Sequence, residues 1–208
     1  MELCQDRFVM FKRLFDIVFS FLGLVLLFPV FVIVALVVKL DSKGPVFYKG
    51  LRVARCGKPF RIYKFRTMIP DADKIGGPST AADDLRLTKV GKFLKQYQLD
   101  ELPQLINVLK GEMSFVGPRP EVPQYIELLS KEEKEKILSV RPGMTDYASL
   151  WNFHEGEILK GSQDPEKTYL EKIRPKKIEL QLKYIKDRSF WLDIKLILKT
   201  IFKIFKNE

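Results

Sequence analysis

The chain has very little histidine and cysteine. Its one histidine, His154, argues against catalysis by a Ser-His or Cys-His pair and against a metal site built from several histidines, and we interpret it as a loop residue. The two cysteines, Cys4 and Cys56, lie far apart without CxxC or Cys/His spacing, so neither a disulfide framework nor a zinc site is predicted. This cysteine usage fits reduced, cytosol-facing surroundings.

Acidic residues are also in the minority. The 208 residues include 36 Lys and Arg against 26 Asp and Glu, which gives a net charge of +10. Such a charge suits an anionic partner, which can be a nucleic acid, an acidic membrane surface or a phosphorylated substrate. The aromatic residues gather in apolar tracts and no nucleic-acid-binding motif is present, so we expect no nucleic-acid partner. The length suits one domain with its own core.

An uncharged apolar run, Ile17–Val38, is long enough to cross a bilayer as one helix. It is too long for the core of a cleaved signal peptide, and no small-residue cleavage site follows it. Arg13 and Lys39 flank it on both sides, so the distribution of cations predicts no orientation. Pro29 interrupts its hydrogen-bond ladder. Two structures remain open on these residues: a kinked span, and a re-entrant helix that breaks at Phe28–Pro29 and returns.

The C-terminal tract Phe190–Lys206 combines large apolar residues with Lys195, Lys199 and Lys203, which recur every fourth residue. This pattern is typical of an amphipathic helix in a membrane interface, and the alternative is a helix packed on its own domain. We therefore divide the chain into a membrane-inserted helix (residues 1–40), a cytosolic catalytic domain (41–187) and an interfacial helix of that same domain (188–208).

Between these ends, residues 46–68 alternate in polarity and predict a small β-hairpin. Lys64 and Arg66 would share one face of its second strand and grip an anion together, unless they only keep an exposed strand soluble. Thr88 is expected to cap a helix that brings Lys95 towards the next motif. The expected fold is α+β and mainly α.

That next motif places Asp100 and Glu101 at the start of a short helix with an apolar face, closed by Gly111. Carboxylates at the positive end of a helix dipole stay ionised. An ionised aspartate can attack phosphorus, and a pair of carboxylates suits Mg²⁺. The alternative is that Asp100 only caps the helix.

Four motifs in this order carry a family resemblance: Lys64–Met68 (KFRTM), Leu99–Gln104 (LDELPQ), Asn107–Pro120 (NVLKGEMSFVGPRP) and Arg141–Thr145 (RPGMT). Together they resemble the bacterial sugar transferase family, the small monotopic phosphoglycosyl transferases that start lipid-linked glycan assembly. The resemblance covers nearly the whole chain.

The resemblance implies transfer of a sugar 1-phosphate from a UDP-sugar to polyprenyl (undecaprenyl) phosphate, with Mg²⁺ and release of UMP. It implies a re-entrant helix in contact with membrane lipids, at the cytosolic face of the bacterial inner membrane, and a role in exopolysaccharide or glycoconjugate biosynthesis. No residue can be tied to a hydroxyl or N-acetyl group, so no particular sugar is predicted. The oligomeric state stays open, with a homodimer as one option.

The resemblance implies that Asp100 is the nucleophile that forms a covalent phosphosugar-aspartyl intermediate. Glu101 would assist through the metal or the incoming phosphate, and both carboxylates are expected to hold the metal. The expected substrate- and phosphate-binding residues are Lys64, Arg66, Lys95, Pro118, Arg119, Pro120 and Arg141. Two positions depart from the family pattern: Lys95 stands where arginine is common, and Phe28–Pro29 replaces Ser-Pro at the helix break. The competing function is a non-catalytic membrane-surface scaffold, which gives no reason for the Asp-Glu pair.

Overall fold

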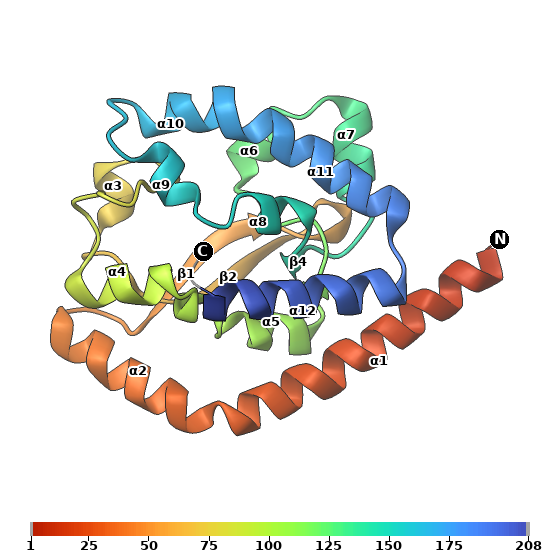
Figure 1. Ribbon diagram of the computed structural model, residues 1–208, viewed down its shortest axis with the longest axis horizontal. Helices are drawn as coiled ribbons and strands as arrows, with labels where there is room; N and C mark the ends of the chain where they lie inside the picture. Colours follow the sequence, from red (N-terminus) through yellow and green to blue (C-terminus); the bar gives the residue numbers. More distant parts are fainter. Residues whose placement is uncertain (1, 207–208) are drawn as a thin grey trace.

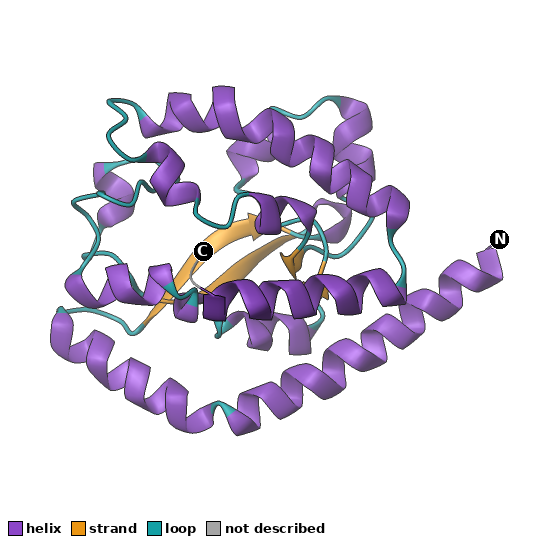
Figure 2. Ribbon diagram, in the orientation of Figure 1, coloured by secondary structure: helices purple, strands orange, loops and turns teal. Residues whose placement is uncertain are grey.

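Helices of very different length surround two small sheets in the computed structural model (Figures 1 and 2). It describes the backbone of residues 2–206 and the side chains of residues 8–206, so the side chain of Cys4 lies outside the described part. One sheet is the antiparallel pair β1 (Phe47–Val53) and β2 (Pro59–Phe65), and the other is the parallel pair β3 (Ser114–Val116) and β4 (Gly143–Thr145). The predicted mainly helical α+β fold with a β-hairpin is confirmed.

The N-terminal segment is a bent pair of helices, α1 (Glu2–Leu26) and α2 (Phe28–Asp41), whose axes differ by 61° across Leu27. The bend has a local cause, because Pro29 lies in the first turn of α2 and has no N–H to donate. The break predicted at Phe28–Pro29 thus lies one residue earlier. Neither helix alone combines the length and hydropathy of a bilayer span, whereas the described parts of the two together do.

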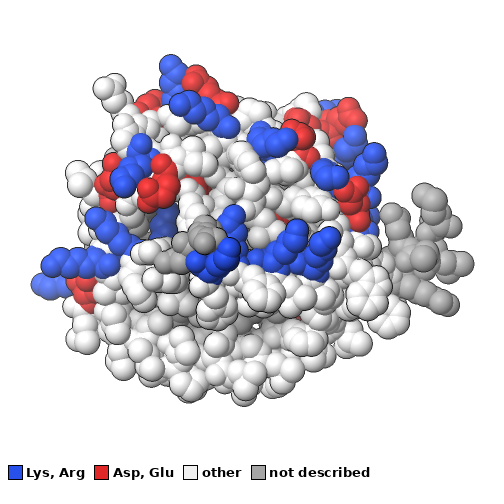
Figure 3. Space-filling view, viewed as in Figure 1, with Lys and Arg blue, Asp and Glu red and all other residues white. Residues whose placement is uncertain are grey.

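Many apolar side chains of this pair point outward, including Phe21 (57% exposed), Phe28 (65%) and Leu36 (60%). Figure 3 shows the result as an uncharged lower surface in the region of α1 and α2. Exposed apolar surface of this extent marks an interaction site.

Three charged residues of α1 hold it against the rest of the chain. Lys12 forms an ion pair with Asp193 and donates to the carbonyl oxygen of Val116 (2.8 Å). Arg13 donates hydrogen bonds to the backbone carbonyl oxygens of residues 108 and 109. Asp16 accepts hydrogen bonds from the side chain of residue 114 and the backbone N–H of residue 115. We expected Arg13 only to flank a membrane segment, and the structure shows that it also fastens that segment to the domain.

The hairpin divides its apolar residues between two cores. Phe60 and Ile62 pack on Val108 and Met113, whereas Phe65 packs on α2. The expected alternation of side chains between the two faces of the strand ends at Phe65, because β2 stops there and Arg66 lies beyond it.

The segment after the hairpin forms α3 (Ala72–Ile75), α4 (Lys89–Gln96), the 3₁₀ turn η2 (Leu99–Glu101) and α5 (Gln104–Lys110). The predicted cap is confirmed, because the Thr88 side chain accepts the N–H of Gly91 (2.9 Å). Gly111 ends α5 with φ 85°, a left-handed conformation that favours glycine. The expected apolar face of α5 is confirmed in part: Leu105 is buried, but Ile106 and Leu109 are only partly buried, and Val108, which lies outside the expected spacing, is buried.

The parallel pair β3–β4 was not predicted, since each strand has only three residues. It depends on a close backbone approach: a Cβ atom at Gly143 would lie 2.1 Å from the nitrogen of Gly117. Between the strands lie α6 (Pro123–Glu127) and α7 (Lys131–Ile137). The sheet places the segment that follows β3 beside the segment that contains β4.

The C-terminal half is helical. Its elements are α8 (Tyr147–Trp151), α9 (Glu155–Leu159), α10 (Pro165–Thr168), the π-helical turn η3 (Tyr169–Ile173), α11 (Arg174–Asp187) and α12 (Phe190–Lys206).

Helix α12 has two apolar faces. Leu196 is buried with Val116 and Tyr184, so this face packs on the domain, while Trp191 (80% exposed) and Phe205 (84%) point outward. Lysine side chains lie along α12, above the uncharged surface (Figure 3). Of the three periodic lysines, Lys195 and Lys199 are exposed, but Lys203 donates to the carbonyl oxygen of Leu150 (2.8 Å). The helix therefore packs on its own domain along one side and exposes apolar side chains along the other, and its placement in a membrane interface stays a prediction.

Candidate active site

Two adjacent carboxylates lie in η2, directly before α5. Asp100 is 6% exposed and Glu101 is 8% exposed, so both carboxylates are largely removed from water. Burial of two neighbouring acids is costly unless cations compensate them. Their partners come from β2, from α4 and from the loop after β3.

Glu101 is held by two cations. Lys64 Nζ lies 2.6 Å from its Oε1, Arg119 Nη1 lies 3.1 Å from its Oε2, and Arg119 Nη2 also bonds to Oε1. Burial alone would raise the pKa of Glu101, but the charges and hydrogen bonds of Arg119 and Lys64 outweigh it and hold that pKa below its ordinary value. Glu101 is therefore a fixed anion.

Asp100 has a different environment. Its nearest cation is Lys64, at 3.9 Å from Oδ2, and no hydrogen bond to it occurs within the described residues. Burial, with a smaller contribution from the charge of Glu101, raises the pKa of Asp100 to about 6. Carboxylates whose surroundings separate their pKa values have separate chemical roles. Asp100 is the less restrained of the two carboxylates.

The structure does not support the interpretation of Asp100 as a helix cap. The residue before α5 is Pro103, and no side chain caps that helix. The turn η2 likewise has no side-chain cap. The position of Asp100 therefore needs a reason other than helix capping.

Lys95 lies in the last turn of α4, and its charge acts on Asp100. Burial is the main cause that lowers the pKa of Lys95 to about 8, and the charge of Asp100 opposes this shift. Lys95 is thus placed where the resemblance implies a cation.

Arg119 is positioned by the sequence Pro118-Arg119-Pro120, which leaves β3. Both prolines are buried and fix the backbone dihedral φ, and the carbonyl oxygen of Pro118 accepts the N–H of Gly143 (3.0 Å). The pairing of β3 with β4 therefore places the Arg119 guanidinium next to Glu101. Pro118 and Pro120 fix the backbone of this loop, and their side chains have no polar group that could contact the carboxylates.

Arg66 does not join this cluster. Its guanidinium is buried and donates to the carbonyl oxygens of Lys43 (2.5 Å), Ser42 (2.8 Å) and Val38 (3.4 Å). It thus binds the C-terminal end of α2, where unpaired carbonyls attract a cation. The expected pairing of Arg66 with Lys64 fails because the strand ends between them.

Arg141 is also placed elsewhere. Its Nε donates to the carbonyl oxygen of Gly111 (3.1 Å), which lies just past the end of α5 opposite to the carboxylates. A helix of seven residues spans about 10 Å. Of the expected binding residues, Lys64, Lys95 and Arg119 gather at Asp100 and Glu101, with Pro118 and Pro120 beside Arg119, whereas Arg66 and Arg141 do not.

The sequence interpretation missed Asn107. This fully buried residue accepts the N–H of Tyr63 at Oδ1 (2.9 Å) and donates from Nδ2 to the carbonyl oxygen of Arg61 (2.8 Å) and to Glu112 (2.7 Å). It fixes β2 to α5, and so sets Lys64 relative to the carboxylates. The available signal was an amide side chain between the apolar residues Ile106 and Val108.

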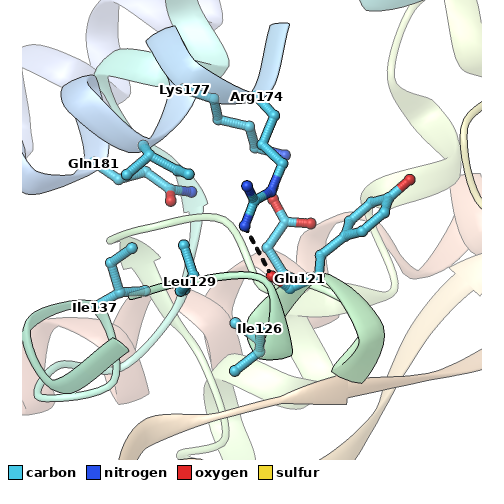
Figure 4. A pocket seen from close by; sticks show the side chains of 9 residues that line it. Glu121, Ile126, Leu129, Ile137, Arg174, Lys177 and Gln181 are labelled. Atoms are coloured by element: carbon cyan, nitrogen blue, oxygen red, sulfur yellow. Dashed lines mark hydrogen bonds and ion pairs between the residues drawn. The ribbon is translucent and has the colours of Figure 1, made fainter. Parts of the chain in front are cut away.

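A small surface pocket lies apart from the carboxylates, between α6, α7 and α11 (Figure 4). Its charged groups already have partners: Lys177 pairs with Glu121 (2.5 Å), and Arg174 donates to the carbonyl oxygen of Tyr125 (3.1 Å). A pocket whose charges are compensated internally offers little to a charged substrate. We therefore do not assign the chemistry to it.

The donor set fits Mg²⁺ only as a partner of substrate phosphates. No cluster of three or more metal-binding side chains occurs among the described residues. Mg²⁺ keeps several waters and is usually held by one or two carboxylates together with phosphate oxygens. Asp100 and the adjacent Glu101 supply two such carboxylates, and that of Asp100 accepts no hydrogen bond from the described residues.

Comparison with known proteins identifies the family of this chain. The family model described as "Bacterial sugar transferase" matches residues 7–207. The chain belongs to this family.

Curated relatives extend the match. The chain is 41% identical over 204 residues to a UDP-glucose:undecaprenyl-phosphate glucose-1-phosphate transferase of Klebsiella pneumoniae. The aligned segment covers 96% of this chain and 41% of that protein. The chain is 36% identical over 193 residues to a UDP-N-acetylgalactosamine-undecaprenyl-phosphate N-acetylgalactosaminephosphotransferase of Aeromonas hydrophila (91% and 42%). It is also 36% identical over 197 residues to the uncharacterized sugar transferase EpsL of Bacillus subtilis (95% and 88%). The chain spans about two fifths of the first two relatives and most of the third.

Proposed function

We propose that this chain transfers a sugar 1-phosphate from a UDP-sugar to undecaprenyl phosphate and releases UMP. The observation that carries the proposal is the pair of adjacent buried carboxylates in unlike surroundings: Glu101 is fixed by Lys64 and Arg119, whereas Asp100 accepts no hydrogen bond from the described residues. The names of the relatives support the substrate classes. Relatives named for glucose and for N-acetylgalactosamine leave the choice of sugar to experiment.

The proposed reaction has two displacements at one phosphorus atom. Asp100 attacks the phosphorus that carries the sugar, the bond from that phosphorus to the bridging oxygen breaks, and UMP leaves with the electron pair. A phosphate oxygen of the lipid then attacks the same phosphorus. The bond to the Asp100 oxygen breaks, which yields the lipid diphosphosugar and restores the carboxylate.

The charges near Asp100 suit this reaction. Two phosphorylated substrates must approach an anionic nucleophile, and Lys64, Lys95 and Arg119 supply fixed positive charge where the phosphates gather. Mg²⁺ held by Asp100 and Glu101 would, when bound, add charge neutralisation on the diphosphate. The Arg119 guanidinium is kept in place by Glu101 even without substrate.

We further propose that α1 and α2 enter the cytosolic leaflet of the bacterial inner membrane and return, with α12 lying in the interface. The 61° bend and the outward apolar side chains of α1, α2 and α12 support this placement. A scaffold protein would need these features too, but it would not need the compensated Asp-Glu pair.

The topology proposal predicts a labelling pattern. Single cysteines at residues 5 and 43 (Gln5→Cys, Lys43→Cys), in a background with Cys4 and Cys56 replaced by serine, should both resist an impermeant maleimide in intact cells and both react after permeabilisation. Labelling of only one of them in intact cells would mean that the chain spans the membrane. Pro29→Leu restores a backbone donor and should shift the segment towards that spanning pattern.

The pH dependence of turnover should follow two groups. Because burial raises the pKa of Asp100 to about 6, activity should rise with pH through that value as the nucleophile ionises. Because burial lowers the pKa of Lys95 to about 8, activity should fall above that value as the cation is lost. Lys95→Arg keeps its charge at every accessible pH and should remove the alkaline decline. An unchanged decline in that variant would contradict the role of Lys95.

The direct test of the function is UMP release from a panel of UDP-sugars by the purified full chain with undecaprenyl phosphate and Mg²⁺. One UDP-sugar should give UMP in proportion to the lipid supplied. A scaffold would release none from any member of the panel.

A further inference from the structure

Two arginines meet at the C-terminal end of α5. Arg13 donates to the carbonyl oxygens of Val108 (2.7 Å) and Leu109 (2.8 Å), and Arg141 donates through Nε to that of Gly111 (3.1 Å). A Cβ atom built on Gly111 would lie 3.2 Å from Nη2 of Arg13. Both guanidinium groups therefore lie beside Gly111, where α5 ends.

A third arginine lies near this place, because the backbone N–H of Cys56, the residue after Arg55, donates to the carbonyl oxygen of Leu138 (2.9 Å), three residues before Arg141. Burial and then the charges of Arg13 and Arg55 lower the pKa of Arg141, and Asp16 is the acidic group that acts against them. Asp16 accepts hydrogen bonds from Ser114 and from the backbone of residue 115, not from an arginine. The cluster of Arg13, Arg55 and Arg141 thus carries a net positive charge.

The cluster still has donors to offer. Arg141 is half-buried, and within the part of the chain that the structure describes its two Nη atoms donate no hydrogen bond. Arg55 is exposed and forms no ion pair there. A guanidinium group with a free pair of Nη donors matches two oxygens of a phosphate.

The position of the cluster indicates where that phosphate comes from. Arg13 lies shortly before the uncharged run Ile17–Val38, at the level where lipid headgroups would surround the proposed membrane segment. The seven residues of α5, about 10 Å of helix, separate it from Asp100 and Glu101 (Figure 1). It is therefore a second place for an anion, apart from the carboxylates.

We propose that Arg13, Arg55 and Arg141 bind the phosphate headgroup of a bilayer lipid and so hold that lipid against the base of α1. The proposal rests on the membrane insertion that belongs to the proposed function, but it does not require catalysis.

The test measures retention of phosphatidic acid by the detergent-solubilised full chain, using native mass spectrometry. Loss of a charge-assisted hydrogen bond predicts that Arg141→Gln weakens retention about tenfold. Arg61→Gln is the matched control, because Arg61 is exposed and also donates one bond to a backbone carbonyl, that of Lys49 (3.0 Å). It should change retention less than about twofold.

A second variant guards against a folding defect. The described side chain of Arg55 forms no hydrogen bond, so Arg55→Gln should weaken retention while leaving the melting temperature unchanged. Equal weakening by Arg61→Gln and Arg141→Gln would mean general charge attraction and would overturn the site. Displacement by inorganic phosphate at equal concentration would overturn the lipid as its ligand. Asp100→Asn should retain phosphatidic acid normally. Failure of the lipid-site proposal can therefore be told apart from failure of the proposed function, which UMP release tests.

Discussion

Asp100→Asn is expected to reduce turnover by about ten-thousand-fold or more, because it removes the nucleophile while keeping the size of the side chain. The same change should stabilise the protein. Burial raises the pKa of Asp100, so the ionised carboxylate lowers the free energy of unfolding at every pH above that pKa. At pH 8 the neutral amide should increase it by on the order of 1–3 kcal/mol. The measurements are UMP release and thermal unfolding of the same preparation.

Asp164→Asn is the matched control for this prediction. Asp164 does cap a helix, since it accepts the N–H of Lys167 (3.0 Å), and asparagine caps equally well. Its activity and stability should stay close to those of the parent chain. Normal turnover by Asp100→Asn would refute the catalytic assignment.

Glu101→Gln should also reduce turnover, by about a hundredfold to a thousandfold, but with the opposite effect on stability. It leaves Lys64 and Arg119 without their shared anion in a largely buried place. Loss of these charge-assisted bonds should lower the free energy of unfolding by about 1–3 kcal/mol. Chemical denaturation at pH 7 compares this variant with Glu132→Gln, which breaks the exposed pair of Glu132 with Lys136 and should change stability little.

The two substitutions thus separate the carboxylates. Both should lose activity, and only Glu101→Gln should lose stability. If Glu101→Gln were as stable and as active as Glu132→Gln, the ion pairs around Glu101 would have no role in holding Arg119.

Local features of the sequence predicted local structure well. The cap at Thr88, the left-handed stop at Gly111 and the bend next to Pro29 each depend on the chemistry of one residue and its immediate neighbours. The carboxylate pair is predictable for the same reason, because Asp100 and Glu101 are adjacent in the chain.

The partners of the basic residues were not predictable in this way. An arginine in a motif can bind a phosphate or a helix C-terminus with the same donors, and the choice depends on which backbone carbonyls the fold brings near. Arg66 meets the end of α2 and Arg141 meets the end of α5, both through contacts distant in sequence. The parallel pair β3–β4 escaped prediction because three-residue strands carry no periodicity.

The central claim is the covalent step at Asp100, and one measurement tests it most directly. The full chain is incubated with Mg²⁺ and its UDP-sugar, labelled in the sugar, without any lipid acceptor. The proposed mechanism predicts a burst of UMP no larger than the amount of protein, with labelled sugar phosphate attached to Asp100 and none attached in Asp100→Asn. UMP release only when undecaprenyl phosphate is present, with no label on the protein, would contradict it and indicate direct transfer between the two substrates.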